Sequence, residues 1–218
     1  MKKIIIPILI IVILGIAGIL ILKGQSKKEK ILPPKIETKM PETRGKKAVM
    51  IIAFRDFRDA EYFVPKEILE RAGIEVKTAS NKLGIAIGAD GGDTNVDLLV
   101  SQIDVSDFDA IIFVGGPGCL KALDNEESYR VAKESVSQNK VLAAICISPV
   151  ILAKAGVLKG KKATVWNDFT RSQAKILERE SATFEDRPVV VDGKIITANG
   201  PGAAEEFGKA ILELLTKK

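Results

Sequence analysis

The sequence contains no histidine among its 218 residues. That absence excludes a Ser-His-Asp triad, a Cys-His dyad and every metal site that uses a histidine ligand. There are only two cysteines, Cys119 and Cys146, which are too few for a disulfide framework or for a zinc site made of cysteine alone. We therefore expect a domain without a bound metal ion.

The positive charge of the chain is confined to its beginning. Residues 1–47 carry 11 Lys and Arg against 3 Asp and Glu, whereas the remaining residues carry 22 against 25. A mildly acidic domain argues against nucleic acid as a partner. A basic tail is instead suited to a position near anionic lipid.

A long apolar run near the start of the chain predicts a membrane anchor at residues 1–22. Residues 4–22 are 19 consecutive uncharged residues flanked by lysines. As a helix they would measure about 28 Å, close to the thickness of a bilayer core. The alternative is a cleaved signal peptide, but the run exceeds the usual apolar region of about 7–15 residues and no A-x-A site follows.

The sequence leaves the side of the membrane open. Lysines that follow the run favour a cytoplasmic domain, whereas the short Met1-Lys2-Lys3 start also resembles that of an exported protein. Residues 23–45, rich in lysine and proline, predict an extended linker. The folded domain is expected at residues 46–218.

Strand and helix patterns alternate through that domain. The continuous apolar run at 48–53 is typical of a buried parallel strand, and strands are also expected at 109–114 and 140–145. Further strands are expected at 74–79 and 163–166, a hairpin excursion at 83–96, and a hairpin about Asp192-Gly193. Helices are expected before Gly73 and at about 125–138, 170–179 and 202–216. This order predicts an α/β fold with a doubly wound, mostly parallel sheet and helices on both faces.

The stretch around Cys146 predicts a strand, a sharp turn and a helix. The apolar run Val141–Ile145 ends at Cys146, and a helical pattern follows with Pro149 in its first turn. A thiol on such a turn is placed like the nucleophile of an elbow motif, and the helix N-terminus would favour its thiolate. The spacing is equally compatible with an inert core cysteine.

Several short motifs occur in an order that resembles the ThiJ/PfpI (DJ-one) family, over about residues 46–216. The motifs are Asp59-Ala60-Glu61 with Pro65, Asp109–Val114 followed by Gly115-Gly116-Pro117-Gly118, Ala144-Ile145-Cys146 with Pro149, Leu158–Thr164, and Val191–Gly202. The resemblance implies a flavodoxin-like sheet of the class I glutamine amidotransferase-like superfamily.

The resemblance also implies roles for individual residues. Cys146 would be the nucleophile and Glu61 the glutamate beside its thiol. Gly115, Gly116 and the backbone N–H of Ile147 would stabilise an oxyanion. A carboxyl buried beside sulfur should have a raised pKa, so that protonated Glu61 could donate to the thiolate and carry protons. The alternatives are an exposed glutamate in a first helical turn and an ordinary glycine turn.

Two departures from the family pattern bear on the activity. Protease-like members have histidine where Ile147 stands, and other members have histidine where Trp166 stands. What remains is a cysteine–glutamate pair, as in the cofactor-free glyoxalase and deglycase members. The resemblance therefore implies an enzyme that acts without a cofactor on a small carbonyl compound or a modified protein. The alternatives are a redox-sensing or chaperone-like stress protein and a cysteine peptidase whose base is supplied across an oligomer interface.

Other residues could contribute to the pocket. Cys119 could resolve an oxidised Cys146 or be a small core residue, and Trp166 could line the pocket or serve packing. Asn167 and Asp168 could also line it or cap a helix. Arg55 and Arg58 could bind an anionic substrate group or be solvated. By analogy with the family, we expect a homo-oligomer.

Overall fold

The computed structural model describes residues 43–217. The predicted anchor at 1–22 and most of the predicted linker at 23–45 therefore lie outside the described residues. Within the described range, no helix combines the length and the apolar character needed to cross a membrane. The anchor stays a prediction.

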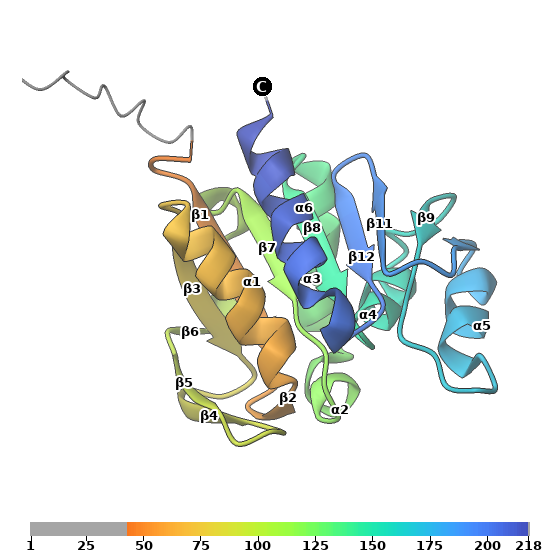
Figure 1. Cartoon of the computed structure of the whole chain (residues 1–218), viewed down its shortest axis with the longest axis horizontal. Coiled ribbons are helices and arrows are strands. Elements are labelled where there is room, and N and C mark those ends of the chain that lie inside the picture. The colour runs from red at the N-terminus through yellow and green to blue at the C-terminus, as the bar shows by residue number, and fades with distance from the viewer. Residues whose placement is uncertain (1–42, 218) are drawn as a thin grey trace, which may run out of the picture. The chain divides into compact units, whose positions relative to one another are not determined.

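A seven-stranded sheet forms the centre of the domain (Figure 1). Its order is β11-β12-β8-β7-β1-β3-β6, and every neighbouring pair is parallel except β11 and β12. The strands are β1 (Lys47–Ile52), β3 (Glu75–Ser80), β6 (Leu98–Leu99), β7 (Ala110–Phe113), β8 (Val141–Ile145), β11 (Val189–Asp192) and β12 (Ile195–Ala198). The prediction of a flavodoxin-like, mostly parallel α/β fold is confirmed for the domain.

Helices cover both faces of this sheet. The long helices α1 (Asp59–Arg71) and α6 (Ala204–Thr216) pack side by side on one face (Figure 1). On the other face α3 (Glu126–Ser137) and α4 (Pro149–Lys154) pack against β8, and α2 (Cys119–Leu123) contributes to the same core. The helix α5 (Ser172–Arg179) packs against α4. Alternation along β1 supplies both cores, since Met50 contributes to the α1/α6 side and Val49 and Ile51 to the opposite side.

A second, three-stranded sheet consists of β2 (Arg55–Phe57), β4 (Gly84–Gly88) and β5 (Asp93–Val96). The segment between β3 and β6 contributes β4 and β5, which confirms the excursion predicted at 83–96. The short strand β2 follows β1 directly and pairs with β4. This small sheet therefore joins the chain at the carboxyl end of β1, the edge where the site is expected.

The strand predicted at 163–166 is wrong in extent and in pairing. Only Lys162–Ala163 forms a strand, β9, and it pairs with β10 (Thr183–Phe184) outside the main sheet. The backbone that follows bonds to other groups: Thr164 N–H donates to the Thr197 hydroxyl (2.9 Å) and Trp166 N–H to the Cys146 carbonyl (2.8 Å). Those bonds direct residues 164–166 toward the Cys146 turn instead of along a strand ladder.

Candidate active site

Cys146 lies on the turn between β8 and α4, in a backbone conformation that few residues with a Cβ adopt. Its φ is +66°, in the left-handed region, at a cost of about 1–2 kcal/mol for an L-residue. Its N–H donates to the Ala198 carbonyl (2.8 Å), and its own carbonyl accepts the Trp166 N–H. The predicted strand, turn and helix are confirmed, and neighbouring backbone on both sides fixes the strained turn.

Ser148 stabilises this turn through hydrogen bonds of its side chain, a role that the sequence analysis did not identify. Its fully buried hydroxyl accepts the N–H of Ile145 (2.9 Å). The same oxygen lies 2.8 Å from the carbonyl oxygens of Phe113 and Ile145, either of which can accept its proton. Ser148 thereby links the ends of β7 and β8. The only feature of the sequence that could have indicated this role is a hydroxyl side chain two residues after the cysteine.

Glu61 is completely buried in the first turn of α1. Its Oε2 accepts the N–H of Gly115 (3.1 Å), and its Oε1 has no hydrogen-bond partner among the described residues. The alternative of an exposed first-turn glutamate is therefore wrong. The prediction for Gly115 is also corrected, because its N–H donates to this carboxyl and is not free for an oxyanion.

Gly115 explains how the carboxyl and the thiol come together. A Cβ at this position would lie 2.7 Å from Glu61 Oε2 and 2.6 Å from the Cys146 Cβ. It would also lie 2.8 Å from the Ile145 carbonyl oxygen. Any side chain here would push the two functional side chains apart, so glycine at the end of β7 is what permits the pair.

Cys146 and Glu61 influence each other's protonation. Burial raises the pKa of Glu61 from 4.5 to about 7, against the lowering effects of hydrogen bonds from Cys146 and Gly115. Burial, followed by the nearby Glu61 charge, raises the pKa of Cys146 from 9.0 to about 12. Between those two pKa values the pair therefore holds one negative charge and one proton.

Two backbone N–H groups oppose the rise of the thiol pKa. The N–H groups of Gly116 and Ile147 act as hydrogen-bond donors to the Cys146 sulfur and lower its pKa. Burial and Glu61 outweigh them, so the expected net preference for thiolate is wrong for the resting pair. The same two N–H groups are available to negative charge that develops next to the sulfur.

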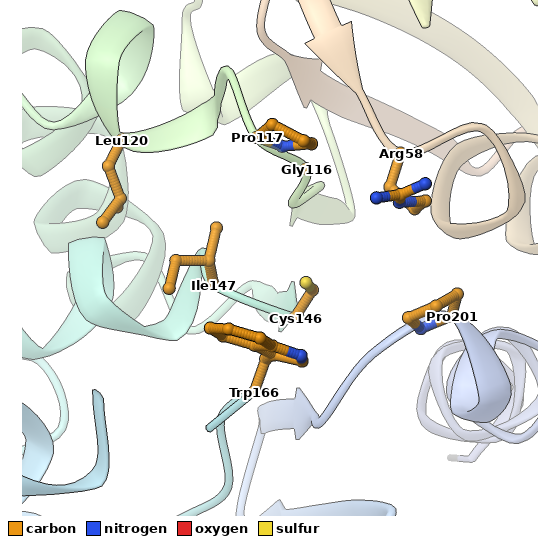
Figure 2. A pocket seen from close by; sticks show the side chains of 8 residues that line it. All are labelled: Arg58, Gly116, Pro117, Leu120, Cys146, Ile147, Trp166 and Pro201. Atoms are coloured by element: carbon orange, nitrogen blue, oxygen red, sulfur yellow. The ribbon is translucent and has the colours of Figure 1, made fainter. Parts of the chain in front are cut away.

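The Cys146 sulfur opens into a pocket of about 390 Å³ (Figure 2). The lining residues are Arg58, Gly116, Pro117, Leu120, Cys146, Ile147, Trp166 and Pro201. Apart from backbone groups and the thiol, the wall is apolar with one cation, Arg58. Such a lining offers apolar contacts around the half-buried Cys146 and charge recognition at one point.

The family model of the DJ-1/PfpI family matches residues 46–214. The chain belongs to the DJ-1/PfpI family. It is 39% identical over 180 residues to an uncharacterized protein of Methanocaldococcus jannaschii, covering 82% of this chain and 87% of that one. It is 30% identical to Deglycase PfpI of Pyrococcus furiosus, covering 77% of this chain and 98% of the relative.

Solved structures of the DJ-1/PfpI family share the fold. A ThiJ/PfpI domain protein from Brachyspira murdochii superposes with a TM-score of 0.75 at 34% identity, over 79% of this chain and 97% of that chain. DJ-1beta of Drosophila melanogaster superposes with a TM-score of 0.71 at 31% identity, over 80% and 92% of the two chains.

The remaining predicted residues of this DJ-1/PfpI domain fall into two groups. Trp166 and Ile147 line the pocket, where the resemblance implied a histidine in other members. Cys119 is completely buried in the core, and burial raises its pKa well above 9.0. Cys119 therefore has the environment of a core residue and not of a reactive thiol.

Asn167 and Asp168 organise the backbone before α5. Asp168 accepts the backbone N–H groups of Thr170 and Ser172 together with both their hydroxyls, and these bonds lower the pKa of Asp168 to about 2. The Asn167 side chain accepts the N–H of Ala174 (2.8 Å). Both side chains therefore accept N–H groups of the first turn of α5, although the N-cap residue itself is Arg171, so the expected N-cap position is corrected. Neither residue lines the pocket over Cys146.

Proposed function

We propose that this domain is a cofactor-free, cysteine-dependent enzyme that acts on reactive carbonyl compounds or on their adducts with proteins. The observation that carries the proposal is the pairing of Cys146, on a strained turn at the base of an apolar pocket, with the buried carboxyl of Glu61. Relatives from Pyrococcus abyssi, Pyrococcus furiosus and Thermococcus kodakarensis that are named deglycases support the same general activity.

The first chemical step is addition of sulfur to an aldehyde. The proton that the pair holds moves from Cys146 to Glu61, and the sulfur attacks the aldehyde carbon of an α-oxoaldehyde. A C–S bond forms while the carbonyl electron pair moves onto oxygen, and Glu61 returns the proton to that oxygen. The N–H groups of Gly116 and Ile147 are placed to stabilise the negative charge during the transfer.

The second step is an internal redox reaction of the resulting hemithioacetal. A proton leaves the former aldehyde carbon and is delivered to the adjacent ketone carbon, while the hydroxyl proton of the hemithioacetal moves to the ketone oxygen. The first carbon thus becomes a thioester carbonyl and the second becomes an alcohol. Water then cleaves the C–S bond and releases an α-hydroxy acid and the thiol. The net reaction adds one water to the oxoaldehyde and needs no external oxidant or reductant. For a protein adduct, sulfur displaces the amine, which leaves with a proton.

Turnover by two single variants tests this proposal. Cys146→Ser should reduce consumption of methylglyoxal to the uncatalysed rate, and Glu61→Gln should lower kcat by roughly 10²–10⁴-fold, the usual contribution of a positioned acid–base group. Cys119→Ser is the matched control and should retain activity, because that thiol is buried in the core. Wild-type turnover by Cys146→Ser, with its fold verified by circular dichroism, would refute the proposal.

The two alternative functions make different predictions. A peptidase would need another base, because the chain contains no histidine and Ile147 and Trp166 occupy the relevant pocket wall; hydrolysis of unfolded protein by wild type but not by Cys146→Ser would favour it. A redox sensor would gain oxygen at Cys146 under mild peroxide without turning over any carbonyl, which intact-mass measurement would show.

We also propose that residues 4–22 tether this enzyme to a membrane. The support is the sequence: 19 uncharged residues between lysines, followed by a basic linker. Ile10→Lys combined with Ile13→Lys should release the full chain from membranes in alkaline carbonate extraction. Retention of the double variant in the membrane pellet, or release of the wild type, would contradict the tether.

A further inference from the structure

Arg58 is the charged residue in the wall of the Cys146 pocket, and its backbone is fixed at the start of α1. Its N–H donates to the Gly115 carbonyl (3.1 Å), and its own carbonyl accepts the N–H groups of Glu61 and Tyr62. The segment that holds Glu61 against the thiol thus also fixes the backbone from which Arg58 reaches the pocket. In Figure 2, Arg58 lies beside Cys146 on the side away from Leu120.

A tight turn of the small sheet positions the Arg58 guanidinium. Asp90, in the turn between β4 and β5, accepts a hydrogen bond from Arg58 Nη1 at 2.7 Å. The backbone N–H groups of Asp90 and Gly92 donate in turn to the two carboxylate oxygens of Asp59, at 2.8 and 2.6 Å. Asp59 follows Arg58 in the chain, so the turn that carries Asp90 is bonded both to the Arg58 guanidinium and to the Asp59 carboxylate.

The turn between β4 and β5 packs tightly around the Asp59 carboxylate, so two positions there favour glycine. A Cβ at Gly88 or at Gly92 would overlap that carboxylate. The N–H of Ala89 also donates to the Phe57 carbonyl (2.8 Å), which attaches the turn to β2. The excursion of β4 and β5 therefore has a specific consequence for the site, because it places a counter-charge that orients one arginine.

Arg58 retains hydrogen-bonding capacity toward the pocket. A guanidinium has five N–H donors, and the Asp90 carboxylate takes one of them in the structure. The Arg58 side chain is 32% exposed, and the pocket wall around it consists of Pro117, Ile147, Trp166 and Pro201 together with backbone. In this apolar surrounding, the strongest partner available to the remaining donors is a negatively charged ligand.

We propose that Arg58 makes this pocket a binding site for anions and directs the enzyme to carbonyl substrates that carry a carboxylate. The carboxylate would pair with the guanidinium while the aldehyde carbon lies at the Cys146 sulfur. The substrate class rests on the proposed function, whereas anion binding by the pocket can be measured without any carbonyl chemistry. Arg58 acts here as a specificity-determining residue that contacts the distal end of the substrate.

Alkylation of Cys146 by a matched pair of reagents tests the anion site. Iodoacetate and iodoacetamide are close in size, and each forms a C–S bond with the thiolate and releases iodide, but only iodoacetate is charged. The ratio of the two rates, normalised to the same ratio for free cysteine, should exceed one in wild type. It should fall about tenfold in Arg58→Gln, the size expected for loss of one hydrogen bond to a charged group.

Two controls make the result specific to Arg58. Arg55→Gln removes an exposed arginine that does not line the pocket, and it should keep the wild-type ratio. Cys146→Ser reports any labelling of Cys119, to be subtracted from both rates. Arg58→Lys keeps the charge without the planar guanidinium and should restore part of the preference. An equal ratio in wild type and Arg58→Gln would overturn the proposal.

Turnover then tests the substrate class. A five-carbon α-oxoaldehyde that ends in a carboxylate should show a kcat/KM at least about tenfold above that of the same aldehyde ending in a methyl group, and Arg58→Gln should remove this preference. Equal kcat/KM values in wild type would overturn the substrate assignment. Failure to turn over either aldehyde, with the alkylation preference present, would refute the proposed function while supporting the anion site.

Discussion

At the scale of single residues, the site depends on the proton held by the Cys146–Glu61 pair and on the absence of a side chain at Gly115. Burial raises the pKa of both Glu61 and Cys146, so a second negative charge in the pair is unfavourable and one proton remains in the pair. Gly115 makes this pairing possible because the space that its Cβ would fill is already bounded by both side chains. The sequence predicted the pair but could not show this dependence on Gly115.

Gly115→Ala is expected to separate the pair. The added methyl group would lie within 2.8 Å of the Cys146 Cβ, a Glu61 oxygen and a carbonyl oxygen, at a typical overpacking cost of about 1–3 kcal/mol. Turnover of methylglyoxal should fall toward the level of Cys146→Ser while the domain remains folded in chemical denaturation. Gly202→Ala is the control, since a Cβ there meets nothing within 4 Å. Full activity in Gly115→Ala would contradict this role.

The raised pKa of Glu61 also predicts how stability depends on pH. Its value is 4.5 in the unfolded chain and about 7 in the folded domain, so only the folded state holds the proton between those values. The stabilisation is present below about pH 4.5 and is lost as the pH rises toward 7, by up to about 3 kcal/mol. Glu61→Gln should therefore gain stability relative to wild type between pH 5 and 8, measured by urea unfolding. A difference independent of pH would argue against the raised pKa.

At the scale of elements, the Cys146 turn is held by contacts with neighbouring strands. The Ser148 hydroxyl links β7 with β8, and the Ala198 carbonyl at the end of β12 accepts the Cys146 N–H. The strands β7 and β8 were predictable because their apolar runs are continuous. The path of residues 164–166 was not, because its hydrogen bonds lead to the Thr197 hydroxyl and to Cys146 and leave no signal in local periodicity.

Replacing the buried residues Ser148 and Ser128 by alanine should have different effects on the free energy of unfolding. Ser148→Ala removes the hydroxyl partner of the buried Ile145 N–H, which should cost about 1–3 kcal/mol of unfolding free energy. The Ser128 hydroxyl is buried without a hydrogen-bond partner among the described residues, so Ser128→Ala should be neutral or stabilising. Urea unfolding of both variants measures the difference. Equal destabilisation would contradict the supporting role of Ser148.

The small sheet shows a second limit of sequence reasoning. The glycine-rich pattern at 83–96 predicted the excursion, and Arg58 was noted as a possible anion ligand with solvation as the alternative. The contact between them could not be predicted, because Arg58 and Asp90 are far apart in the sequence and meet through a turn built on Asp59. Such long-range polar contacts have no periodic signature.

At the scale of the whole domain, the parallel sheet collects the site from distant segments. Arg58, Gly116, Cys146, Trp166 and Pro201 line one pocket although they come from five separate parts of the chain. Gly116, Cys146 and Pro201 follow β7, β8 and β12 of the main sheet, and the carboxyl edge of a doubly wound sheet is where such loops converge. Arg58 and Trp166 follow β2 and β9, which belong to the two small sheets. The fold class and the place of the site could therefore be predicted from strand order, while the chemistry at the pocket wall required the structure.

The side chains that could serve as metal ligands in this domain predict that its activity does not depend on metal ions. The chain has no histidine, and residues 43–217 contain no group of three acidic or cysteine side chains placed to hold a metal. Dialysis against a strong chelator should leave methylglyoxal turnover within about twofold of the untreated enzyme, a difference of less than 1 kcal/mol in the barrier. Loss of activity that zinc or magnesium restores would contradict this expectation.

The most direct test of the Cys146–Glu61 pair is the rate of Cys146 alkylation by iodoacetamide as a function of pH. Wild type should show a step in reactivity near pH 7, where Glu61 titrates, and a further rise at high pH. Glu61→Gln should lose the lower step and show a single transition, at a lower pH than the upper step of wild type because the neighbouring negative charge is gone. Identical profiles without a step near pH 7 would show that the two groups titrate independently and would contradict the coupling of their protonation.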